Sequence, residues 1–562
     1  SRLLGAAEQN NNQGGGGGGG GNSPQYFYSR RIGAPPSGTA DGDFVDYPAT
    51  TTILGAAKLT GRLASGTSVG FLGALTTEEV ARTFVVTTKL FGEQRVAPRT
   101  LYGVGRVQQE FGAAGSTAAF MMTMAKRDVS PGDPLGAFSA RNAFTASGES
   151  LFRFRDGEYE VGMNLGMSRV TGEEAGIERL QRSSARYFHR PDVSYVSLDP
   201  NRSSLTGIKA GLSAERTSGR HWLWQANTDV ISPGFEINDL GRLNVADRIS
   251  ATTQLQYRET EPGRIFRNYA VGIEHERDWN FGGALQASQV EGEAEVTWPN
   301  FWETEISFGI DAAAEDDRLT RGGPTMGTPR GWSSSFMVRN SDAARTRANV
   351  RLELDGNEDG GSGQELSADL TFRPATRWQL TLSPAVEREI NDRQYVTTVE
   401  QGPSSTFGRR YVFAFVDRTT LSSEIRLNYA FKPDVNLEFY GEPFAASGRY
   451  YDFGQLAAPG SRLRQPLATS ASGTSASSLV LTDGTSNFSL RNRDFNVLSF
   501  RSNLVLRWEW RPGSTLYLVW QQDREESEIT RTRVGLRDIF GSFGAAGHNV
   551  LAVKTTFWIG GL

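Results

Sequence analysis

The chain contains no cysteine, only four histidines and no long uninterrupted hydrophobic run. The lack of cysteine excludes a disulfide framework and any metal site built on thiolates. No segment approaches the roughly 18–20 consecutive apolar residues that a membrane-spanning helix requires. Hydrophobic residues make up only 38% of the 562 residues, and the mean hydropathy is −0.42. The net charge of −4 gives no bulk attraction to nucleic acid, so no nucleic-acid partner is expected.

Evidence for catalysis is sparse. The metalloprotease motif His-Glu-x-x-His is missing, and neither His221 nor His275 has a serine–aspartate pairing nearby in sequence, whereas His189 and His548 fall in predicted extracellular loops. The histidines are His189, His221, His275 and His548. A Ser-His-Asp hydrolase assembled in space from distant loops stays a minor alternative. We therefore expect no enzymatic activity and no catalytic residues.

Short segments of alternating apolar and polar residues recur along most of the chain. Residues 347–354, 365–372 and 423–429 are clear examples. A period of two places one kind of side chain on each face of a strand. Here the polar face carries charges and the other face is apolar. The alternation continues along the chain with no segment that looks like a linker between domains. This pattern is typical of an all-β transmembrane barrel with a wet lumen.

Short and long connections alternate between these segments, as they do in outer-membrane barrels. The short connections are rich in Gly, Pro, Asp and Ser, which tight turns favour. Ten are expected: Leu63–Gly66, Gly112–Gly115, Arg155–Glu158, Thr217–Arg220, Glu261–Arg264, Pro299–Phe301, Ser341–Arg345, Pro374–Arg377, Lys432–Asp434 and Arg511–Ser514. The longest of the other connections are Gly172–Ser203, Ala446–Asp494 and Glu525–His548. Ten short turns predict about 22 antiparallel strands with both ends periplasmic and the long loops extracellular.

Aromatic residues cluster beside the short turns, where a girdle at the periplasmic membrane interface is expected. They are Trp298, Phe301, Trp302, Phe372, Trp378, Tyr429, Phe431, Trp508, Trp510 and Tyr517. General enrichment of aromatics in strands is the simpler alternative. The final strand, Asn549–Ile559, is expected to carry Leu551, Val553, Phe557 and Ile559 on one face, as strands read by barrel-assembly machinery do.

The polar face predicts two charged walls in the lumen. The acidic wall consists of Glu291, Glu293, Glu295, Glu303, Glu305 and Asp311. The basic wall consists of Arg31, Lys58, Arg62 and Lys554. In a barrel of about 22 strands these walls would lie across from each other and create a transverse field. An equally supported alternative is that nearby arginines neutralise the acidic wall; the candidates are Arg258, Arg264, Arg267 and Arg277.

One loop resembles half of a calcium-binding loop. Asp355, Asn357 and Asp359 are followed by Gly360, so oxygen ligands alternate before a glycine turn. The second half of the pattern fails, because position twelve is Leu366. A solvated acidic hairpin tip is the favoured interpretation, and no other cofactor is expected.

The N-terminal residues have a different composition. Residues 10–22 include an unbroken run of eight glycines, which are costly to order. We expect residues 1–24 to be a flexible tether and residues 25–562 to be the barrel. Ser1 is expected to lie inside a longer precursor.

Several stretches resemble a bacterial family catalogued as domain of unknown function 5916. They are residues 26–33, 53–62, 103–108, 233–241, 411–414, 428–434 and 443–448. The resemblance implies an outer-membrane barrel that follows a secretory signal and an N-terminal carbohydrate-binding-family-9-like domain. It implies no established activity.

Two functions follow as expectations. The first is a channel or transport barrel for small polar solutes, with a charged lumen narrowed by loops. The second is a surface scaffold that anchors or docks a partner or a carbohydrate-binding domain without conducting. In both cases the protein would lie in the outer membrane of a diderm bacterium, in contact with its lipid and lipopolysaccharide. Surface or periplasmic protein partners would be needed for the second.

Overall fold

The computed structural model describes residues 24–470, 475, 477–529 and 532–558. The glycine-rich residues 10–22 lie outside the described residues. The chain divides into two compact units. The first unit comprises the chain up to residue 255 together with residues 275–288 and 315–325. The second comprises residues 256–274, 289–314 and 326–562.

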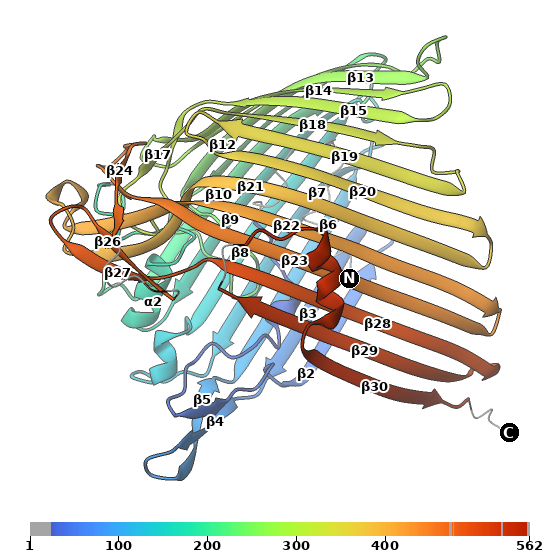
Figure 1. Cartoon of the computed structure of the whole chain (residues 1–562). Helices are drawn as coiled ribbons and strands as arrows, with labels where there is room; N and C mark the ends of the chain where they lie inside the picture. The colour runs from blue at the N-terminus through green and yellow to red at the C-terminus, as the bar shows by residue number, and fades with distance from the viewer. Residues whose placement is uncertain (1–23, 471–474, 476, 530–531, 559–562) are drawn as a thin grey trace. The chain divides into compact units, whose positions relative to one another are not determined.

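Twenty-two strands form one antiparallel sheet with a barrel topology, as predicted (Figure 1). The first eight strands are β2 (Ile53–Arg62), β3 (Thr67–Thr76), β6 (Thr100–Phe111), β7 (Ser116–Arg127), β8 (Asn142–Phe154), β9 (Tyr159–Thr171), β10 (Ser204–Arg216) and β11 (Trp222–Ile231). The next seven are β12 (Arg248–Glu259), β13 (Asn268–Trp279), β14 (Leu285–Thr297), β15 (Glu303–Asp311), β18 (Gly331–Arg339), β19 (Thr346–Asn357) and β20 (Ser362–Ala375). The last seven are β21 (Trp378–Glu400), β22 (Arg409–Lys432), β23 (Val435–Leu456), β24 (Arg464–Pro466), β28 (Phe495–Arg511), β29 (Ser514–Glu528) and β30 (Gly547–Thr556).

The remaining elements are short and lie in the connections. Three small sheets contain β1 (Phe44–Asp46), β4 (Glu79–Val85) and β5 (Leu90–Ala97); β16 (Ala314–Asp316) and β17 (Met326–Thr328); and β25 (Ala468–Ser470), β26 (Ser478–Thr482) and β27 (Asn487–Arg491). The helices are η2 (Ser29–Arg31), η3 (Pro134–Ala137), α2 (Glu174–Gln181), η4 (Ser404–Thr406), α3 (Leu536–Gly541) and η5 (Ser542–Gly544). Within the described residues, no helix has the length and apolar character needed to cross a bilayer.

All ten predicted short connections join consecutive strands of the sheet. In the first of them, the backbone N–H of Gly66 donates to the carbonyl oxygen of Leu63 at 3.0 Å, which closes the turn between β2 and β3. Gly66 has a φ of +82°, a conformation that glycine adopts without steric cost. The long connection Gly172–Ser203 also begins and ends where it was predicted, between β9 and β10.

Several boundaries differ from the prediction. The connection predicted at Glu525–His548 is shorter, because β29 continues to Glu528 and β30 begins at Gly547. Residues 25–52 lie outside the large sheet and do not form its first strand, because Tyr26 and Phe27 are buried side by side instead of alternating. The three-residue strand β24 belongs to the sheet by pairing with the end of β23. Pairing with β22 and β24 extends β23 to Leu456, so the loop predicted to begin at Ala446 begins eleven residues later, at Ala457.

The extension of β21–β23 has its own small core. Buried apolar residues of these strands pack with those of β26, β27 and the preceding connection. They are Val396, Val412, Ala414, Phe453, Leu467, Leu479, Leu481 and Leu490. This core explains why the strands continue through sequence that is rich in small and polar residues.

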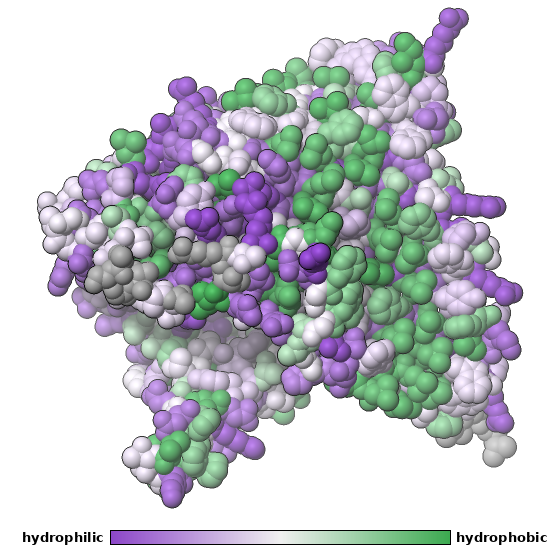
Figure 2. Space-filling model, viewed as in Figure 1, coloured by the Kyte–Doolittle hydropathy of each residue, from purple (hydrophilic) through white to green (hydrophobic). Residues whose placement is uncertain are grey.

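Register in the second unit produces a row of apolar side chains, which we call the outer row. Its members share one face because each pairs directly with the next. From β14 to β28 they are Ala294, Ile306, Phe336, Leu352, Leu366, Val386, Leu421, Ala445 and Leu498. Large members such as Leu366 and Val386 remain about half exposed. Figure 2 shows hydrophobic residues gathered over the middle of the strands near the C-terminus. An exposed apolar band of this kind is expected of a wall that faces lipid.

The predicted aromatic residues lie close to the short turns. Trp508 contacts Trp510 with ring centroids 6.2 Å apart, and Trp510 contacts Phe557 at 5.5 Å. Tyr517 is an exception to the girdle, because it pairs with Lys554 on the polar face of the sheet. The final strand β30 is as expected in carrying Leu551 and Val553 together on the face opposite Lys554.

Candidate functional site: the inner face of the sheet and the loops folded over it

The predicted acidic residues lie on one face of β14 and β15, opposite the outer row. Glu295 pairs directly with Glu305, and the next inner pair is Thr297 with Glu303. Glu291 and Glu293 share this face, across from Gly309 and Ser307. Asp311 completes the set by pairing with Gln289. The structure therefore brings all six acidic residues together on the inner face of the second unit.

The acidic face continues across strands that the sequence did not single out. Glu353 on β19 pairs directly with Glu365 on β20, and Glu365 pairs directly with Glu387 on β21. We call these three residues the acidic ladder. Like charges directly opposite each other on a sheet are destabilising. Three carboxylates in a row on neighbouring strands therefore do not stabilise the fold, which indicates that they serve a function.

Among the described residues, ion pairs with arginine form at both ends of the acidic ladder. Arg351 lies 3.4 Å from Glu353, and Arg418 lies 2.7 Å from both Glu387 and Glu389. Glu365, in the middle, has a carboxylate on each side. Glu303 is also neutralised, but by Arg339 of β18 and not by an arginine that was expected to do so. The inner face of the second unit thus carries a surplus of negative charge that attracts cations.

The four residues of the predicted basic wall lie on three different elements. Lys58 and Arg62 lie on β2, two steps apart on the face shared with Ser68 of β3. Arg62 forms an exposed ion pair with Glu110 at 2.7 Å. Lys554 lies on β30, whereas Arg31 belongs to η2 and is not on a strand. The transverse field between the two walls stays a prediction.

Arg31 links the N-terminal segment to a connection that is distant in sequence. Its guanidinium donates to the carbonyl oxygen of Gly241 at 2.9 Å and to Oδ1 of Asn238 at 3.0 Å. The backbone N–H of Tyr28 donates to the carbonyl oxygen of Leu240 at 2.7 Å. These bonds fasten the N-terminal segment to the connection that follows β11.

The residues of the calcium-like loop are engaged in other contacts. Asn357 Oδ1 accepts the backbone N–H groups of Asp359 and Gly361 at 3.0 Å each, so it caps its own turn. The Asp359 carboxylate is paired with Arg393 and with Arg462. Asp355 lies within β19. Among the residues that the structure describes, no three acidic or histidine side chains gather as a metal-binding group.

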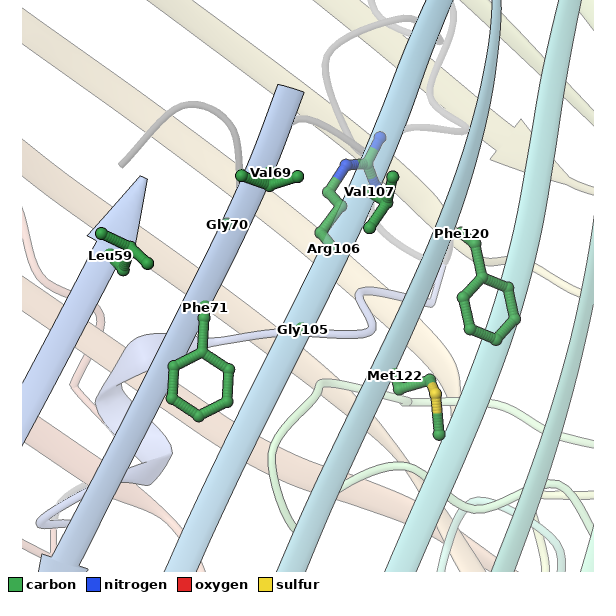
Figure 3. Close-up of a pocket in the computed structure, with 9 residues that line it drawn as sticks. All are labelled: Leu59, Val69, Gly70, Phe71, Gly105, Arg106, Val107, Phe120 and Met122. Carbon is green, nitrogen blue, oxygen red and sulfur yellow. The ribbon is translucent and has the colours of Figure 1, made fainter. Parts of the chain in front are cut away.

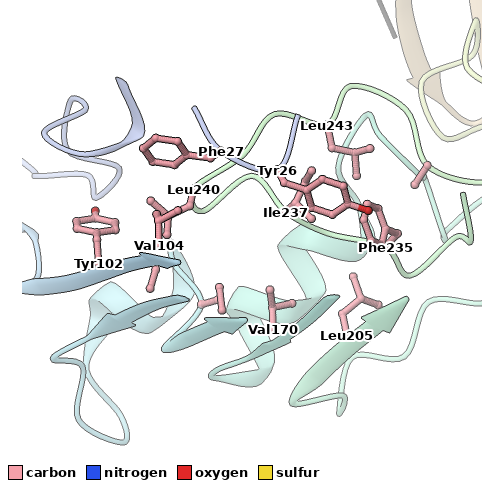
Figure 4. Close-up of a cluster of buried hydrophobic side chains, with 14 of the residues drawn as sticks. Tyr26, Phe27, Tyr102, Val104, Val170, Leu205, Phe235, Ile237, Leu240 and Leu243 are labelled. Carbon is pink, nitrogen blue, oxygen red and sulfur yellow. The ribbon is translucent and has the colours of Figure 1, made fainter. Parts of the chain in front are cut away.

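The inner face of the first unit is covered by connections that fold against it (Figure 4). Strand β7 shows the pattern: Phe120 and Met122 are exposed on the outer side, whereas Met121 and Ala125 on the inner side are buried. The covering residues include Tyr26 and Phe27 and four side chains of the connection after β11. Those four are Phe235, Ile237, Leu240 and Leu243. The Tyr26 and Phe235 rings meet edge to face, with centroids 6.1 Å apart.

The Tyr26 hydroxyl reaches the sheet itself. It occupies the place that a side chain on Gly166 would need. Burial, together with the negative charges of Asp229 and Glu149, raises the pKa of Tyr26 well above its usual value. The phenol is therefore neutral at any physiological pH.

Buried ion pairs fix the covering connections in place. Arg186 and Glu236 are paired at 2.6 Å, with both side chains almost fully buried. Arg190 binds Asp247 at 2.9 Å and also binds Asp317. The Tyr195 hydroxyl donates to Asp247 at 2.6 Å. Burial and this neighbouring carboxylate raise the pKa of Tyr195.

Arg186 also donates to backbone carbonyl oxygens of both connections. The acceptors are Leu180 at 2.8 Å, Pro233 at 3.1 Å and Phe235 at 2.8 Å. A buried guanidinium with this many partners is stable because nearly every donor is satisfied. No local sequence pattern pointed to this ion pair, since Arg186 and Glu236 are 50 residues apart.

Two hollows lie in the first unit. One, of about 300 Å³, is lined by polar and apolar residues of the two covering connections, including Ser183, Ser184, Glu236 and Asn238. The other, of about 430 Å³, lies on the outer face (Figure 3). There Gly105 pairs with Phe71 on one side and with Met122 on the other, and its missing side chain leaves a space between these two exposed residues. Its apolar lining suits hydrocarbon and not a polar solute.

Residues 66–70 have the sequence Gly-x-Ser-x-Gly, which in some hydrolases carries a nucleophilic serine. That chemistry requires a sharp turn from a strand into a helix. Here the segment leads from a hairpin turn into β3, and Ser68 pairs in register with Arg62 and Gln108. The local geometry is that of a regular strand.

Comparisons with known proteins place the chain in a family. No curated protein matches it. Among solved structures, it is similar to the siderophore receptor PirA from Acinetobacter baumannii, with a TM-score of 0.38, 11% identity, and coverage of 88% of this chain and 74% of that one. It is similar to a mutant of the ferric enterobactin receptor PfeA from Pseudomonas aeruginosa, with a TM-score of 0.35, 9% identity, and coverage of 88% and 72%.

A third similar structure is the anion-selective porin from Comamonas acidovorans, with a TM-score of 0.26, 11% identity, and coverage of 59% of this chain and 91% of that one. Similarities at this level leave the function of the chain open. The family model, in contrast, matches residues 22–560. The chain belongs to the family described as Domain of unknown function (DUF5916).

Proposed function

We propose that this protein is an outer-membrane barrel of a diderm bacterium through which small polar solutes pass. The observation that carries the proposal is the contrast between the two faces of the second unit. The outer row is apolar and exposed, whereas the inner face presents the acidic ladder and the acidic residues of β14 and β15. A wall that is apolar outside and charged inside suits lipid on one side and water on the other.

The charge of the inner face indicates which solutes are favoured. An excess of carboxylates over the arginines that pair with them raises the local concentration of cations and of the ammonium groups of zwitterions. Salt weakens this attraction beyond roughly 8–10 Å, so it acts on solutes close to the wall. Small hydrophilic solutes with a positive group are therefore the preferred class, and apolar solutes are disfavoured.

The covered inner face of the first unit supports a narrowed passage. Its apolar cluster and the pairs Arg186–Glu236 and Arg190–Asp247 hold the connections against the sheet. Close packing combined with buried ion pairs does not open and close readily. We infer that these connections are a fixed lining and not a gate.

The same lining favours the second candidate, a barrel that anchors or docks a partner without conducting. A scaffold needs a rigid, filled interior, and the first unit has one along its inner face. Solute flux separates the two functions, because a scaffold with a sealed interior passes nothing.

The test is a swelling assay with liposomes that contain the purified protein. Flux of a small zwitterionic amino acid, faster than that of an anionic solute of equal size, is expected. The matched variant lacks residues 457–487 of the connection between β23 and β28. This deletion removes β24, β25 and β26, but the long strands of the sheet should still fold and the flux should rise. No flux from either protein, with the barrel folded, would support the scaffold and overturn the proposal.

A further inference from the structure

The connection between β29 and β30 lies against the outer face of the second unit. We call its described residues, 532–546, the strap; they include α3 and η5. Figure 1 shows α3 in front of β23 and β28, and the helix contacts these strands. Long connections of barrels ordinarily leave the sheet, so a connection that turns back over its outer wall needs a reason.

Burial along the outer row locates the strap. Leu366 is 52% exposed and Val386 is 45% exposed, but the next two members, Leu421 and Ala445, are only 5% and 0% exposed. Val534 of the strap forms a buried cluster with Leu421 and Ala445. The strap thus takes the place that lipid would occupy at this point of the row.

Polar contacts hold the strap at this position. The backbone N–H of Val534 donates to the Ser447 hydroxyl at 3.1 Å, and Arg533 is paired with Asp417 at 2.6 Å. Rings of Phe543 and Phe500 meet edge to face, with centroids 4.6 Å apart. Asp538 accepts the backbone N–H of Gly535 at 2.7 Å and caps α3. These contacts fix the strap to the outer face of the sheet.

The side of the strap that faces away from the sheet is apolar. Leu536 and Phe540 are each 70% exposed, and their spacing of four residues places them on one side of α3. Phe543 remains 41% exposed beside them. The exposed Arg537 lies next to Leu536. Exposed Leu536 and Phe540 on α3, with Phe543 on η5 and the neighbouring Arg537, are unfavourable in water and typical of a membrane interface.

The height of the strap agrees with that interpretation. It contacts β28 near Leu498, whereas the aromatic residues Trp508 and Trp510 lie near the other end of the same strand. The stretch from Leu498 to Trp508 spans roughly 25 Å along the membrane normal at the usual strand rise and tilt, which is the height of an apolar band. The strap therefore lies at the edge of the band that is far from the short turns.

We propose that the strap is an interfacial anchor that binds lipid of the outer leaflet. Acyl chains contact Leu536, Phe540 and Phe543, and Arg537 lies at the level of the headgroup phosphates. Continuity with the outer row identifies lipid as the occupant. This inference rests on the proposed membrane location, and the experiment below separates the two.

The absence of cysteine from the chain permits a clean test with single-cysteine variants. Three variants carry a polarity-sensitive fluorophore and are placed in liposomes that contain shallow nitroxide-labelled lipid. Phe540→Cys reports on the strap. Leu366→Cys reports on the outer row, and Leu463→Cys reports on an exposed position of the connection after β23, where Leu463 is 72% exposed.

The expected result is a blue-shifted emission at Phe540→Cys and nitroxide quenching at least about twofold stronger than at Leu463→Cys. One outcome would overturn the anchor but not the membrane location. In it, the probe at Leu366→Cys is quenched, whereas the probe at Phe540→Cys behaves like the probe at Leu463→Cys. If the probe at Leu366→Cys is also unquenched, the membrane location fails together with the anchor.

A second variant keeps the test independent of the probe. Leu536→Ser combined with Phe540→Ser alters exposed side chains only, so the barrel should still fold. Co-purifying lipid should fall relative to the wild type, and Arg537→Gln should reduce the preference for anionic over zwitterionic lipid. Unchanged lipid content and preference in both variants would contradict the proposal.

Discussion

At the scale of single residues, glycines decide how closely the covering connections approach the sheet. A side chain on Gly207 would meet the backbone of Phe235, with its Cβ 2.1 Å from the Phe235 nitrogen. Backbone cannot move aside as a flexible side chain can. Gly105, in contrast, has nothing within 4 Å of a Cβ. The close approach of the connection after β11 to the sheet therefore requires that Gly207 carry no side chain.

We predict that Gly207→Ala displaces this connection and lowers the free energy of unfolding by about 1–3 kcal/mol, the usual cost of overpacking. Gly105→Ala is the matched control and should be close to neutral. Thermal unfolding and proteolysis within residues 232–247 report the two effects. Equal stability and equal protease resistance of both variants would contradict the close approach seen here.

The buried pair of Arg186 with Glu236 gives a second prediction at this scale. Arg186→Ala leaves Glu236 buried without its partner, which typically costs about 3–5 kcal/mol. Arg182 is paired with Glu178 at the surface of α2, and its loss should cost no more than about 0.5 kcal/mol. Denaturant unfolding measures both variants. A small loss for Arg186→Ala would mean that the pair does not hold the connections.

At the scale of elements, the outer row predicts an asymmetry between neighbouring positions of β19. Leu352 belongs to the row, and Arg351 points to the opposite face. A charge on the lipid side costs about 2–4 kcal/mol at the middle of the bilayer. Leu352→Arg should therefore impair assembly more than Arg351→Leu, as judged from heat-modifiability on gels. Equal tolerance would count against this register.

The turn between β26 and β27 predicts a dependence on pH. Asp483 accepts the backbone N–H groups of Ser486 and Thr485 at 2.8 Å each, and Arg410 lies 2.7 Å away. These donors lower the pKa of Asp483 far below its usual value. A lowered pKa stabilises the fold above the unfolded-state pKa of about 4, and this contribution is lost as the pH falls further.

The stability difference between the wild type and Asp483→Asn should accordingly be largest near pH 7 and shrink below pH of about 4. Thermal unfolding of both proteins over this range is the measurement. A difference that stays constant with pH would show that the carboxylate charge does not stabilise the turn.

Local patterns predicted the elements well, and they failed where distant residues decide the outcome. Glycine, proline and aspartate located all ten short turns, since turn chemistry is local. The acidic ladder escaped notice because Glu353, Glu365 and Glu387 become neighbours only through strand register. The strap and the pair of Arg186 with Glu236 depend on tertiary contacts. Residues 25–33 were expected to belong to the barrel, but they form a partly buried segment outside the large sheet. Their aromatic composition fits a strand and such a segment equally well.

At the scale of the whole molecule, the fold predicts which ends of the strands are accessible on intact cells. The short turns should be periplasmic and the long connections extracellular. Asp342 lies in the turn between β18 and β19, and its side chain is 90% exposed. Leu463→Cys should react with an impermeant reagent on intact cells, and Asp342→Cys only after lysis. The reverse order would invert the topology.

The central claim is that the acidic inner face borders a conducting path. The most direct test is the reversal potential of the purified protein in a planar bilayer under a salt gradient. The wild type should conduct with a preference for cations. Glu353→Gln, Glu365→Gln and Glu387→Gln together should shift the reversal potential towards anions, while the outer-row variant Leu366→Val should leave it unchanged. An unshifted potential in the triple variant, or no conductance from any folded variant, would contradict the account.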